Sequence, residues 1–465
     1  MASVGADTSI AAEASRTVAA DWAGAFLNTR GHHLPPDVTE IASRAVLDFI
    51  GVALAGSQLP VGRIVEGYFT GLGGRPEATV LSSRARLPGI HAAIVNGVHG
   101  HTLDMDDGHR LAAGHPGAAV MAAALAAAEM HQRSGAELLR AVTVGYEVFV
   151  RLGRIMNPTH LRRGFHTTAT VGPIAAAAAA AMLHPAIDEQ RFVRAIGLSG
   201  VQGAGLLEVL RDGAMAKPFQ TGRASAAGLL AVELASRGME GPRSIIEGED
   251  GFLAAMCGPV DTSALVDGIG ADWAITGIYF KAHASCRHTH AAIDVIQQLR
   301  REGLVPEQVA SVAVHTYSVA WEMCGSSVLP TGPVEAKFSI PFTVALALSK
   351  GHAAQSAFTE QAVKDEAIRA LAQRVSVVVA PDLDAGYPRR RGVRVHVALR
   401  DGTDRTVEIP LPRGEPELPL DLTDLSLKFH ENVRGVIDQD LAARIERAVL
   451  ALESVQDITE VWRGA

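Results

Sequence analysis

The sequence predicts a mainly α-helical protein that carries a second, α+β domain. Apolar and small residues recur at helical spacing from about residue 10 to 265, whereas β-branched runs first occur after about residue 275. A proline-rich connector at 410–419 then leads to a last helical segment. At 465 residues the chain exceeds what one hydrophobic core usually organises, so two domains are expected.

The first part of the chain shows helical periodicity throughout and no strand-like alternation. Glycine or proline separates the helical segments, which we expect at 41–55, 117–132, 136–156, 171–182 and 224–237. The run 167–187, with seven consecutive alanines, is expected to be a buried helix and not a membrane span, because alanine is only weakly apolar. These segments predict an all-helical domain over residues 1–270.

The second part alternates strands with helices. Strands are expected at 309–317, 375–379, 393–399 and 406–409, and helices at 290–302 and 341–348. The last two strands are joined across Arg400-Asp401-Gly402-Thr403, which indicates a hairpin. We therefore expect an α+β domain over residues 275–420. A helix at 438–452 predicts that 425–465 returns to complete the helical domain.

Composition excludes several classes of partner. A formal net charge of −8 argues against nucleic acid or an anionic membrane as the partner. Three scattered cysteines, Cys257, Cys286 and Cys324, are too few for a disulfide framework and suit a reducing cytosol. The N-terminus shows no basic segment followed by an apolar core, so we expect a cytoplasmic protein.

The densest group of ionisable side chains lies in the stretch 96–116, which holds four histidines and three aspartates. Such groups must be hydrogen-bonded to one another, bound to a metal or kept for chemistry, because burying each unpaired costs about 1–3 kcal/mol. Potential metal ligands are His99, His101, Asp104, Asp106, Asp107 and His109. On a helix only His101 and Asp104 would share a face, so we expect no metal, and a metal-dependent hydrolase remains an alternative.

Two histidines precede predicted helices. His115 stands directly before Pro116, a favoured first helical residue, so the imidazole faces the positive end of the helix dipole. That field favours a neutral imidazole able to accept a proton, although a purely structural capping role is the alternative. His166, in GFHTTAT, is a second candidate whose alternative is again structural.

Lys217 and Arg223 lie in DGAMAKPFQTGRA. Pro218 predicts that Lys217 sits in a turn, ahead of a helix that starts near Thr221. Cations at a helix N-terminus are electrostatically unfavourable, so we expect these two side chains to bind an anion such as a substrate carboxylate.

The segment KAHASCRHTH, residues 281–290, is a second cluster ahead of a helix. We expect Thr289 to cap that helix, and Arg287 and His288 to bind substrate, since a guanidinium holds a carboxylate through two hydrogen bonds. Thiol catalysis by Cys286 is the less favoured alternative.

Six ordered motifs resemble the MmgE/PrpD family over essentially the whole chain: DMDD, GHP, GFHTTAT, KPFQTGRA, CRHTH and PVEAKFSIPF. That family includes 2-methylcitrate dehydratase, cis-aconitate decarboxylase and iminodisuccinate epimerase. The resemblance implies an all-helical domain built from both chain ends, a smaller α+β lid domain, a homodimer, no cofactor and no metal. It also implies an active site in the cleft between the domains.

Matched position by position, the resemblance implies a pocket formed by Asp104, His115, His166 and Lys217. Where decarboxylases of the family carry a histidine and a tyrosine, this chain has Cys286 and Cys324. These departures favour a dehydratase or epimerase over a decarboxylase.

The sequence thus predicts a cofactor-independent lyase or isomerase that moves a proton at a carbon next to a carboxylate of a small di- or tricarboxylate. We expect Lys217 and Arg223 to neutralise the anion, one histidine to act as base and Asp104 to orient a histidine. A cis-aconitate-type decarboxylase and a non-catalytic polycarboxylate-binding protein are further alternatives.

Overall fold

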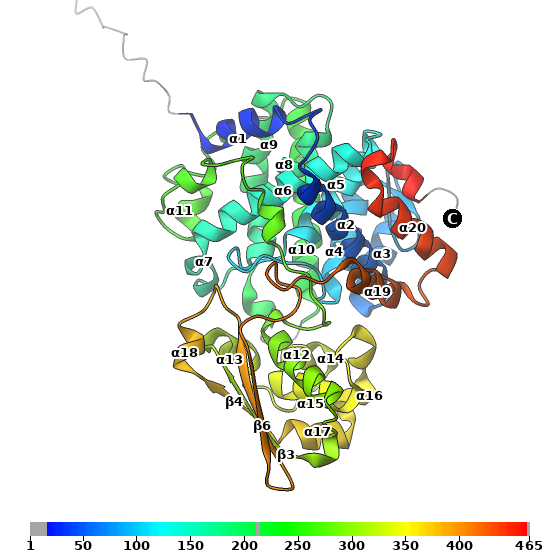
Figure 1. Cartoon of the computed structure of the whole chain (residues 1–465). Helices are drawn as coiled ribbons and strands as arrows, with labels where there is room; N and C mark the ends of the chain where they lie inside the picture. Colours follow the sequence, from blue (N-terminus) through cyan, green and yellow to red (C-terminus); the bar gives the residue numbers. More distant parts are fainter. Residues whose placement is uncertain (1–15, 211–213, 463–465) are drawn as a thin grey trace, which may run out of the picture.

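The computed structural model describes residues 16–210 and 214–462, which fold into a large helical body and a smaller α+β body (Figure 1). The larger hydrophobic core draws on residues between Val18 and Phe280 and on residues between Leu420 and Val461. A second core is formed mainly by residues between Ala284 and Val397. The predicted combination of a mainly helical domain with an α+β domain is confirmed.

The helices of the large body from the first part of the chain are α1 (Val18–Leu27), α2 (Pro36–Gly56), α3 (Pro60–Leu72), α4 (Gly89–Thr102), α5 (Pro116–Met130), α6 (Gly135–Met156), α7 (Thr159–Arg162), α8 (Thr167–Leu183), α9 (Glu189–Gly200), α10 (Ala216–Ser236) and α11 (Phe252–Met256). A two-residue antiparallel pair, β1 (Ala78–Thr79) with β2 (Arg86–Leu87), interrupts the all-helical pattern that the sequence predicts. So short a ladder has too little periodicity to be visible in the sequence.

Three small-residue helices, α5, α8 and α10, run parallel at the centre of this body. The residues before α5 and α8 touch, because the His115 backbone N–H donates to Thr168 Oγ1 at 3.1 Å. At the opposite ends, His131, His184 and Glu233 place side-chain atoms within 4.8 Å of one another. The seven consecutive alanines of α8, residues 175–181, are all fully buried, which permits this close packing.

The C-terminal segment returns to the large body through α19 (Leu422–Val433) and α20 (Gln439–Leu450), which pack on α2 (Figure 1). A buried ion pair ties them together, since Lys428 Nζ on α19 lies 2.5 Å from Asp48 Oδ1 on α2. Both chain ends therefore contribute to one core.

The smaller body holds a four-stranded sheet in the order β4-β3-β5-β6. Its strands are β3 (Val309–Thr316), β4 (Val375–Val379), β5 (Val393–Leu399) and β6 (Asp404–Ile409). β3 pairs parallel with β4 and antiparallel with β5, and β5 and β6 form the predicted hairpin. Its helices are α12 (Arg287–Arg301), α13 (Ser318–Cys324), α14 (Pro333–Ala336), α15 (Ile340–Lys350), α16 (Glu360–Lys364), α17 (Glu366–Ala372) and α18 (Pro381–Asp384).

Two helix starts differ from their predictions. α10 begins at Ala216, so Lys217 lies in its first turn and not in a preceding turn. Pro218 is tolerated there because the first-turn N–H groups have no intrahelical acceptor to lose. α12 begins at Arg287 after Cys286, so Thr289 lies inside the helix and donates from its hydroxyl to the Cys286 carbonyl oxygen at 2.9 Å.

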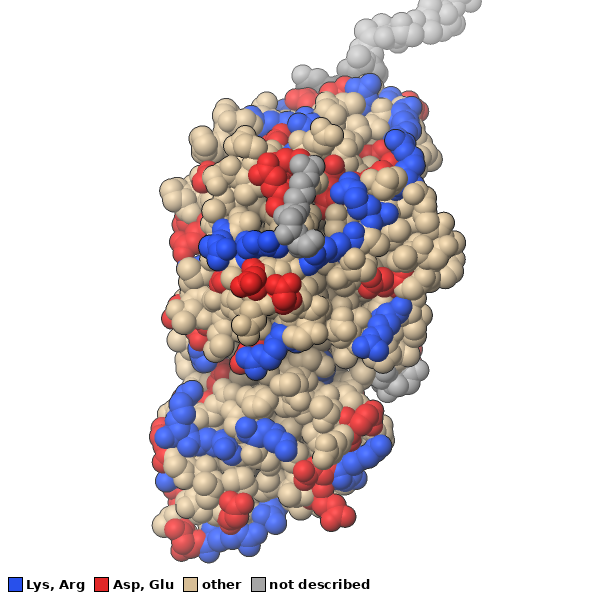
Figure 2. Space-filling model, turned by 90° about the vertical axis from the view of Figure 1, so that its right-hand side faces the viewer, with Lys and Arg blue, Asp and Glu red and all other residues tan. Residues whose placement is uncertain are grey.

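On the face shown in Figure 2, lysines and arginines are interspersed with aspartates and glutamates over both bodies. Within residues 16–210 and 214–462, no single helix is both long and apolar enough to cross a membrane. One bent pair of helices, α2 with α3, has the combined length and composition of a membrane span.

The contact between α8 and α10 predicts a steric limit at Gly228. A Cβ at this position would lie 2.7 Å from both Ala177 N and the Pro173 carbonyl oxygen on α8. We expect Gly228→Ala to lower the free energy of unfolding by about 1–3 kcal/mol, because backbone atoms must move apart. The control is Gly67→Ala on the exposed side of α3, where a Cβ meets nothing within 4 Å and helix propensity predicts a gain of about 0.5–1 kcal/mol. Equal denaturation midpoints for Gly228→Ala and wild type would contradict the close packing.

Candidate active site

The site is built on the loop that follows α4. Asp104 adopts a left-handed backbone conformation, with φ of +55°, which aspartate tolerates better than most residues. This conformation turns the chain sharply after α4 ends at Thr102. The side chain of Asp104 is buried. The turn brings Asp104, Asp106 and Asp107 inside the protein beside the starts of α5, α8 and α10.

Two lysines neutralise Asp104. Lys217 Nζ lies 2.5 Å from Asp104 Oδ1, and Lys281 Nζ lies 3.3 Å from Asp104 Oδ2. Burial alone raises the pKa of this carboxyl, but the two ammonium groups outweigh burial and hold the pKa of Asp104 well below its usual value. Asp104 is therefore a carboxylate near neutral pH, and it contacts lysines instead of orienting a histidine as expected.

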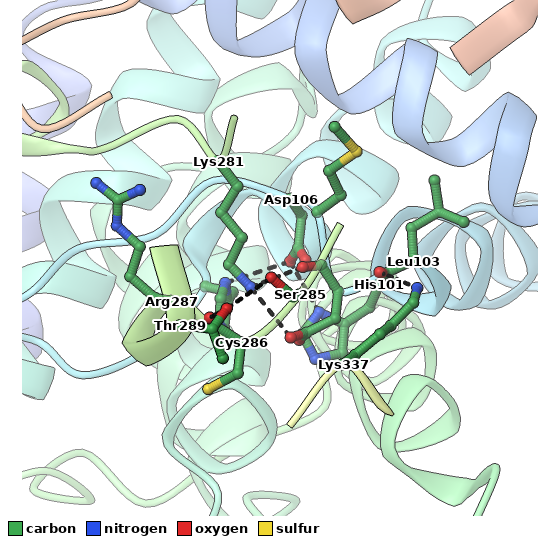
Figure 3. Close-up of polar contacts among 12 residues, drawn as sticks. His101, Leu103, Asp106, Lys281, Ser285, Cys286, Arg287, Thr289 and Lys337 are labelled. Carbon is green, nitrogen blue, oxygen red and sulfur yellow. Dashed lines mark hydrogen bonds and ion pairs between the residues drawn. The ribbon is translucent and has the colours of Figure 1, made fainter. Parts of the chain in front are cut away.

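Three buried lysines also hold the backbone of this loop. Lys337 Nζ donates to the Leu103 carbonyl oxygen at 2.6 Å, Lys281 Nζ to the Asp104 carbonyl oxygen at 2.8 Å, and Lys428 Nζ to the Met105 carbonyl oxygen at 2.9 Å. Figure 3 shows Lys281 and Lys337 reaching this loop beside His101 and Asp106. Burial lowers the pKa of Lys337 to about 7, against the attraction of Asp104.

Three histidine rings meet beside this cluster. The ring centroid of His101 lies 5.2 Å from that of His115 and 5.8 Å from that of His166. His101 Nδ1 lies 2.8 Å from Asp106 Oδ2, so the carboxylate that holds a histidine is Asp106. The structure thus brings together His115, His166 and Lys217 as the sequence predicts, and adds a third histidine.

The hydrogen bonds define the tautomers of the two predicted bases. His115 Nδ1 must carry a proton, because it donates to the Asp107 carbonyl oxygen at 2.6 Å. His166 Nδ1 likewise donates to Gln220 Oε1 at 3.2 Å, while Gln220 Nε2 donates to the Leu206 carbonyl oxygen. Both rings therefore keep a lone pair on Nε2, the atom that accepts a proton in base catalysis.

The electrostatic surroundings keep both rings uncharged. Burial lowers the pKa of His115 to about 3, against the attraction of Asp106. Burial, His101 and Lys217 hold the pKa of His166 well below its usual value. A neutral imidazole at pH 7 is the form that can take up a proton.

Arg223 lies apart from these groups. Its guanidinium donates to the carbonyl oxygens of Gln202, at 3.0 Å, and Ala204, at 2.5 Å. It lines a cavity of about 440 Å³ whose wall also includes Gln220, the partner of His166. Gln220 thus lies between this cavity and His166, whereas the hydrogen bonds of the Arg223 guanidinium go to backbone carbonyl oxygens.

The other two predicted binding residues have partners within the chain. Arg287 donates to Glu415 Oε1 at 2.9 Å and its guanidinium lies 4.5 Å from the Tyr279 ring centroid. His288 Nδ1 lies 2.6 Å from the Tyr317 hydroxyl. Because Glu415 already occupies the guanidinium, Arg287 has an internal carboxylate partner in this structure.

Cys286 and Cys324 lie together beside the site. Both are buried. A hydrogen bond between the two thiols lowers the pKa of Cys286, whereas burial, together with that hydrogen bond, raises the pKa of Cys324 well above its usual value. Asp104 and Lys281 lie close enough to influence both thiols. The two thiols are thus in mutual contact.

The remaining histidines of the 96–116 stretch have other partners. His99 Nε2 lies 3.2 Å from the Gly62 carbonyl oxygen, and His109 Nδ1 accepts from the Ala112 N–H at 3.2 Å. Within the described ranges, the group with metal-ligand spacing is instead His131, His184 and Glu233, at the far ends of α5, α8 and α10. There the Ala186 N–H donates to His184 Nδ1, which leaves the proton on Nε2, the nitrogen that faces Glu233.

Sequence reasoning missed the supporting lysines. Lys281 and Lys337 each lie in a motif already singled out, KAHASCRHTH and PVEAKFSIPF, so their position beside other polar residues was the available signal. Lys428 lies on an ordinary amphipathic helix and carries no such signal. Its role depends on where α19 packs.

The structure combines a helical body, an α+β body and a buried cluster of histidine, aspartate and lysine side chains. Comparison with known families identifies the class of two-domain protein to which it belongs. The MmgE/PrpD N-terminal domain matches residues 20–264, and the MmgE/PrpD C-terminal domain matches residues 283–454. The chain belongs to the MmgE/PrpD family.

Curated relatives match over nearly the whole chain. Cis-aconitate decarboxylase of Mus musculus is 27% identical over 463 residues, which cover 96% of this chain and 93% of the relative. Cis-aconitate decarboxylase of Homo sapiens is 26% identical, covering 97% and 95%, and that of Aspergillus terreus is 26% identical, covering 94% and 93%. These relatives are enzymes, and they support an enzyme here.

The environment of His115 predicts an unusual titration. With the pKa lowered to about 3 by burial, the imidazole should stay neutral across about pH 5–8, whereas a free histidine titrates near 6.5. NMR of protein labelled at the histidine ring Cε1, with His115→Gln to assign the signal, measures this directly. A His115 midpoint near pH 6.5 would contradict a buried, neutral base.

Proposed function

We propose that this protein is a cofactor-independent lyase or isomerase, of dehydratase or epimerase type, acting on a small di- or tricarboxylate. The observation that carries the proposal is a neutral His115 with its lone pair on Nε2, set beside a second neutral histidine and a lysine-rich cluster. The proposed substrate is a small anionic carboxylate. We also propose that the protein forms a homodimer.

The chemistry requires both a base and nearby cations. Removing a proton from carbon next to a carboxylate builds an enolate-like anion, which a buried site stabilises only with positive charge close by. Lys217 and Lys281 supply that charge, and the start of α10 adds the positive end of its dipole. We assign proton removal to His115 Nε2, which becomes an imidazolium and can return the proton to the carbon or to the leaving hydroxide. His166, whose Nε2 is also free, is the alternative base.

A decarboxylase is the second candidate, and the names of the full-length relatives favour it. Against it stand Cys286 and Cys324, which occupy the positions where the family resemblance implies a histidine and a tyrosine in decarboxylases. Loss of a carboxyl group and loss of a neighbouring proton lead to similar anions, so the same lysines serve either reaction.

The reaction class is testable with a panel of substrates. Purified protein is incubated with hydroxylated and unsaturated di- and tricarboxylates, including cis-aconitate, and ¹H NMR follows products while a coupled assay follows released carbon dioxide. Dehydration, hydration or epimerisation without carbon dioxide supports the proposal. Stoichiometric carbon dioxide from cis-aconitate overturns it in favour of the decarboxylase, and activity lost after chelation overturns the cofactor-independent mechanism.

Variants of Lys217 and His115 should separate binding from proton transfer. We expect Lys217→Ala to weaken substrate binding and turnover together, because it removes the cation beside Asp104. His115→Gln should leave binding nearly intact and reduce turnover by roughly 10² or more, the usual loss when a positioned base is removed. Steady-state kinetics on the substrate found above measures both effects.

The matched control is His33→Gln, since the His33 side chain is 89% exposed and lies far along the chain from the site. It should leave kcat and KM unchanged. If His115→Gln kept full activity but melted well below wild type, His115 would be a structural cap and the base would have to be His166.

A further inference from the structure

A buried network of Tyr146, Asp107 and Gly117 lies directly behind His115. The Tyr146 hydroxyl donates to Asp107 Oδ2 at 2.5 Å, and the Gly117 N–H donates to Asp107 Oδ1 at 3.1 Å. Tyr146 is fully buried in the middle of α6, and Asp107 is only 4% exposed. Both carboxyl oxygens are therefore occupied by donors from two different helices.

The backbone of Asp107 is what His115 touches. The His115 ring makes one hydrogen bond, from Nδ1 to the Asp107 carbonyl oxygen, while the nearest carboxylate oxygen, Asp106 Oδ2, lies 3.6 Å from Nδ1. The tautomer of His115 consequently depends on the position of one loop carbonyl group. Tyr146 and Gly117 fix that carbonyl group by fixing the side chain of the same residue.

The sequence supports this network at two positions. Gly117 is required because a Cβ there would lie 2.5 Å from Asp107 Oδ1 and 2.7 Å from the Tyr146 hydroxyl oxygen. Tyr146 is one of five tyrosines in the chain and lies in a core otherwise dominated by alanine and aliphatic residues, where a phenylalanine would fill the same volume. A buried hydroxyl without a partner costs about 1–3 kcal/mol, so its presence requires the Asp107 carboxyl group.

The charge of Asp107 fits a supporting role. Burial raises the pKa of Asp107 to about 8, even though the Tyr146 hydroxyl and the Gly117 N–H lower it, so a negative charge on this carboxyl group is disfavoured. Burial also raises the pKa of Tyr146 well above its usual value, which keeps the phenol protonated as a donor. A pair whose surroundings disfavour charge on both members acts by holding geometry.

We propose that Tyr146 and Asp107 are positioning residues for His115: by anchoring the Asp107 carbonyl group, they keep the His115 proton on Nδ1 and leave Nε2 free to act as the base. The inference rests on the proposed function of His115, and it adds two residues that do not touch the substrate.

The test combines kinetics with the tautomer of His115. In ¹⁵N-histidine-labelled Tyr146→Phe, the ring nitrogen shifts of His115 should move from the single Nδ1–H form toward a mixture of both tautomers. On the substrate identified by the panel, kcat should fall about tenfold or more while KM stays within about threefold. Gly117→Ala, which pushes the Asp107 carboxyl group from the other side, should give the same spectral change if Tyr146→Phe does not fold.

The control is Thr143→Val, which removes another fully buried hydroxyl from the same helix, one that bonds to the Leu139 carbonyl oxygen at 2.8 Å. It should alter neither the His115 shifts nor kcat. Unchanged shifts in Tyr146→Phe would overturn the positioning role whatever the kinetics, and an equal loss of kcat in Thr143→Val would overturn it as well. If the shifts move but His115→Gln remains fully active, the positioning contact stands and the proposed function of His115 fails.

Discussion

Three buried lysine side chains bind three consecutive backbone carbonyl oxygens, at Leu103, Asp104 and Met105, and the rest of the site depends on these contacts. Hydrogen bonds from charged donors are each worth about 1.5–3 kcal/mol, so together they can hold a loop that would otherwise have little regular structure. The lysines come from the segment before α12, from the end of α14 and from α19. The loop is thereby tied at once to the α+β body and to the C-terminal return.

This arrangement explains why an acidic protein has a site suited to anions. The chain carries a net charge of −8, yet the lysines gather around Asp104 and the starts of α5, α8 and α10 converge on the same place. Helix N-termini carry partial positive charge and unpaired N–H groups, which favour an anion further. The buried alanines of α8 let the helices approach closely enough for His115, His166 and Lys217 to meet.

Much of this could be predicted from the sequence because the signals are local. Helical periodicity, the switch to β-branched runs and the Asp401-Gly402 hairpin each depend on neighbouring residues, and His115 before Pro116 is the N-cap of α5 as predicted. The turn predicted at Lys217 was wrong, because the steric preference before proline is weaker than the packing that extends α10 to Ala216. Glu415, which lies 128 residues further along the chain, holds the guanidinium of Arg287, and no local pattern indicates that contact. Substrate binding by Arg287 stays a prediction.

The contacts that could not be predicted are those that join distant segments. Lys337 and Lys428 reach the loop across 234 and 323 residues of sequence, and nothing near either lysine identifies its acceptor. In the sequence, Asp107 is one of several polar residues in the stretch 96–116. Only the tertiary structure, in which the Tyr146 hydroxyl donates to its carboxyl group, distinguishes Asp107 from its neighbours. Spacing identified the cluster, but the division of roles among its aspartates depends on tertiary packing.

The central claim is that this cluster moves a proton at a carbon next to a carboxylate, and solvent exchange measures that step most directly. The protein is incubated in D₂O with the panel of di- and tricarboxylates, and NMR follows deuterium in the recovered compounds. The account predicts deuterium at the carbon next to a carboxylate of one compound, at a rate reduced roughly 10² or more in His115→Gln. Binding of a carboxylate without any exchange, or exchange at an undiminished rate in His115→Gln, would contradict it.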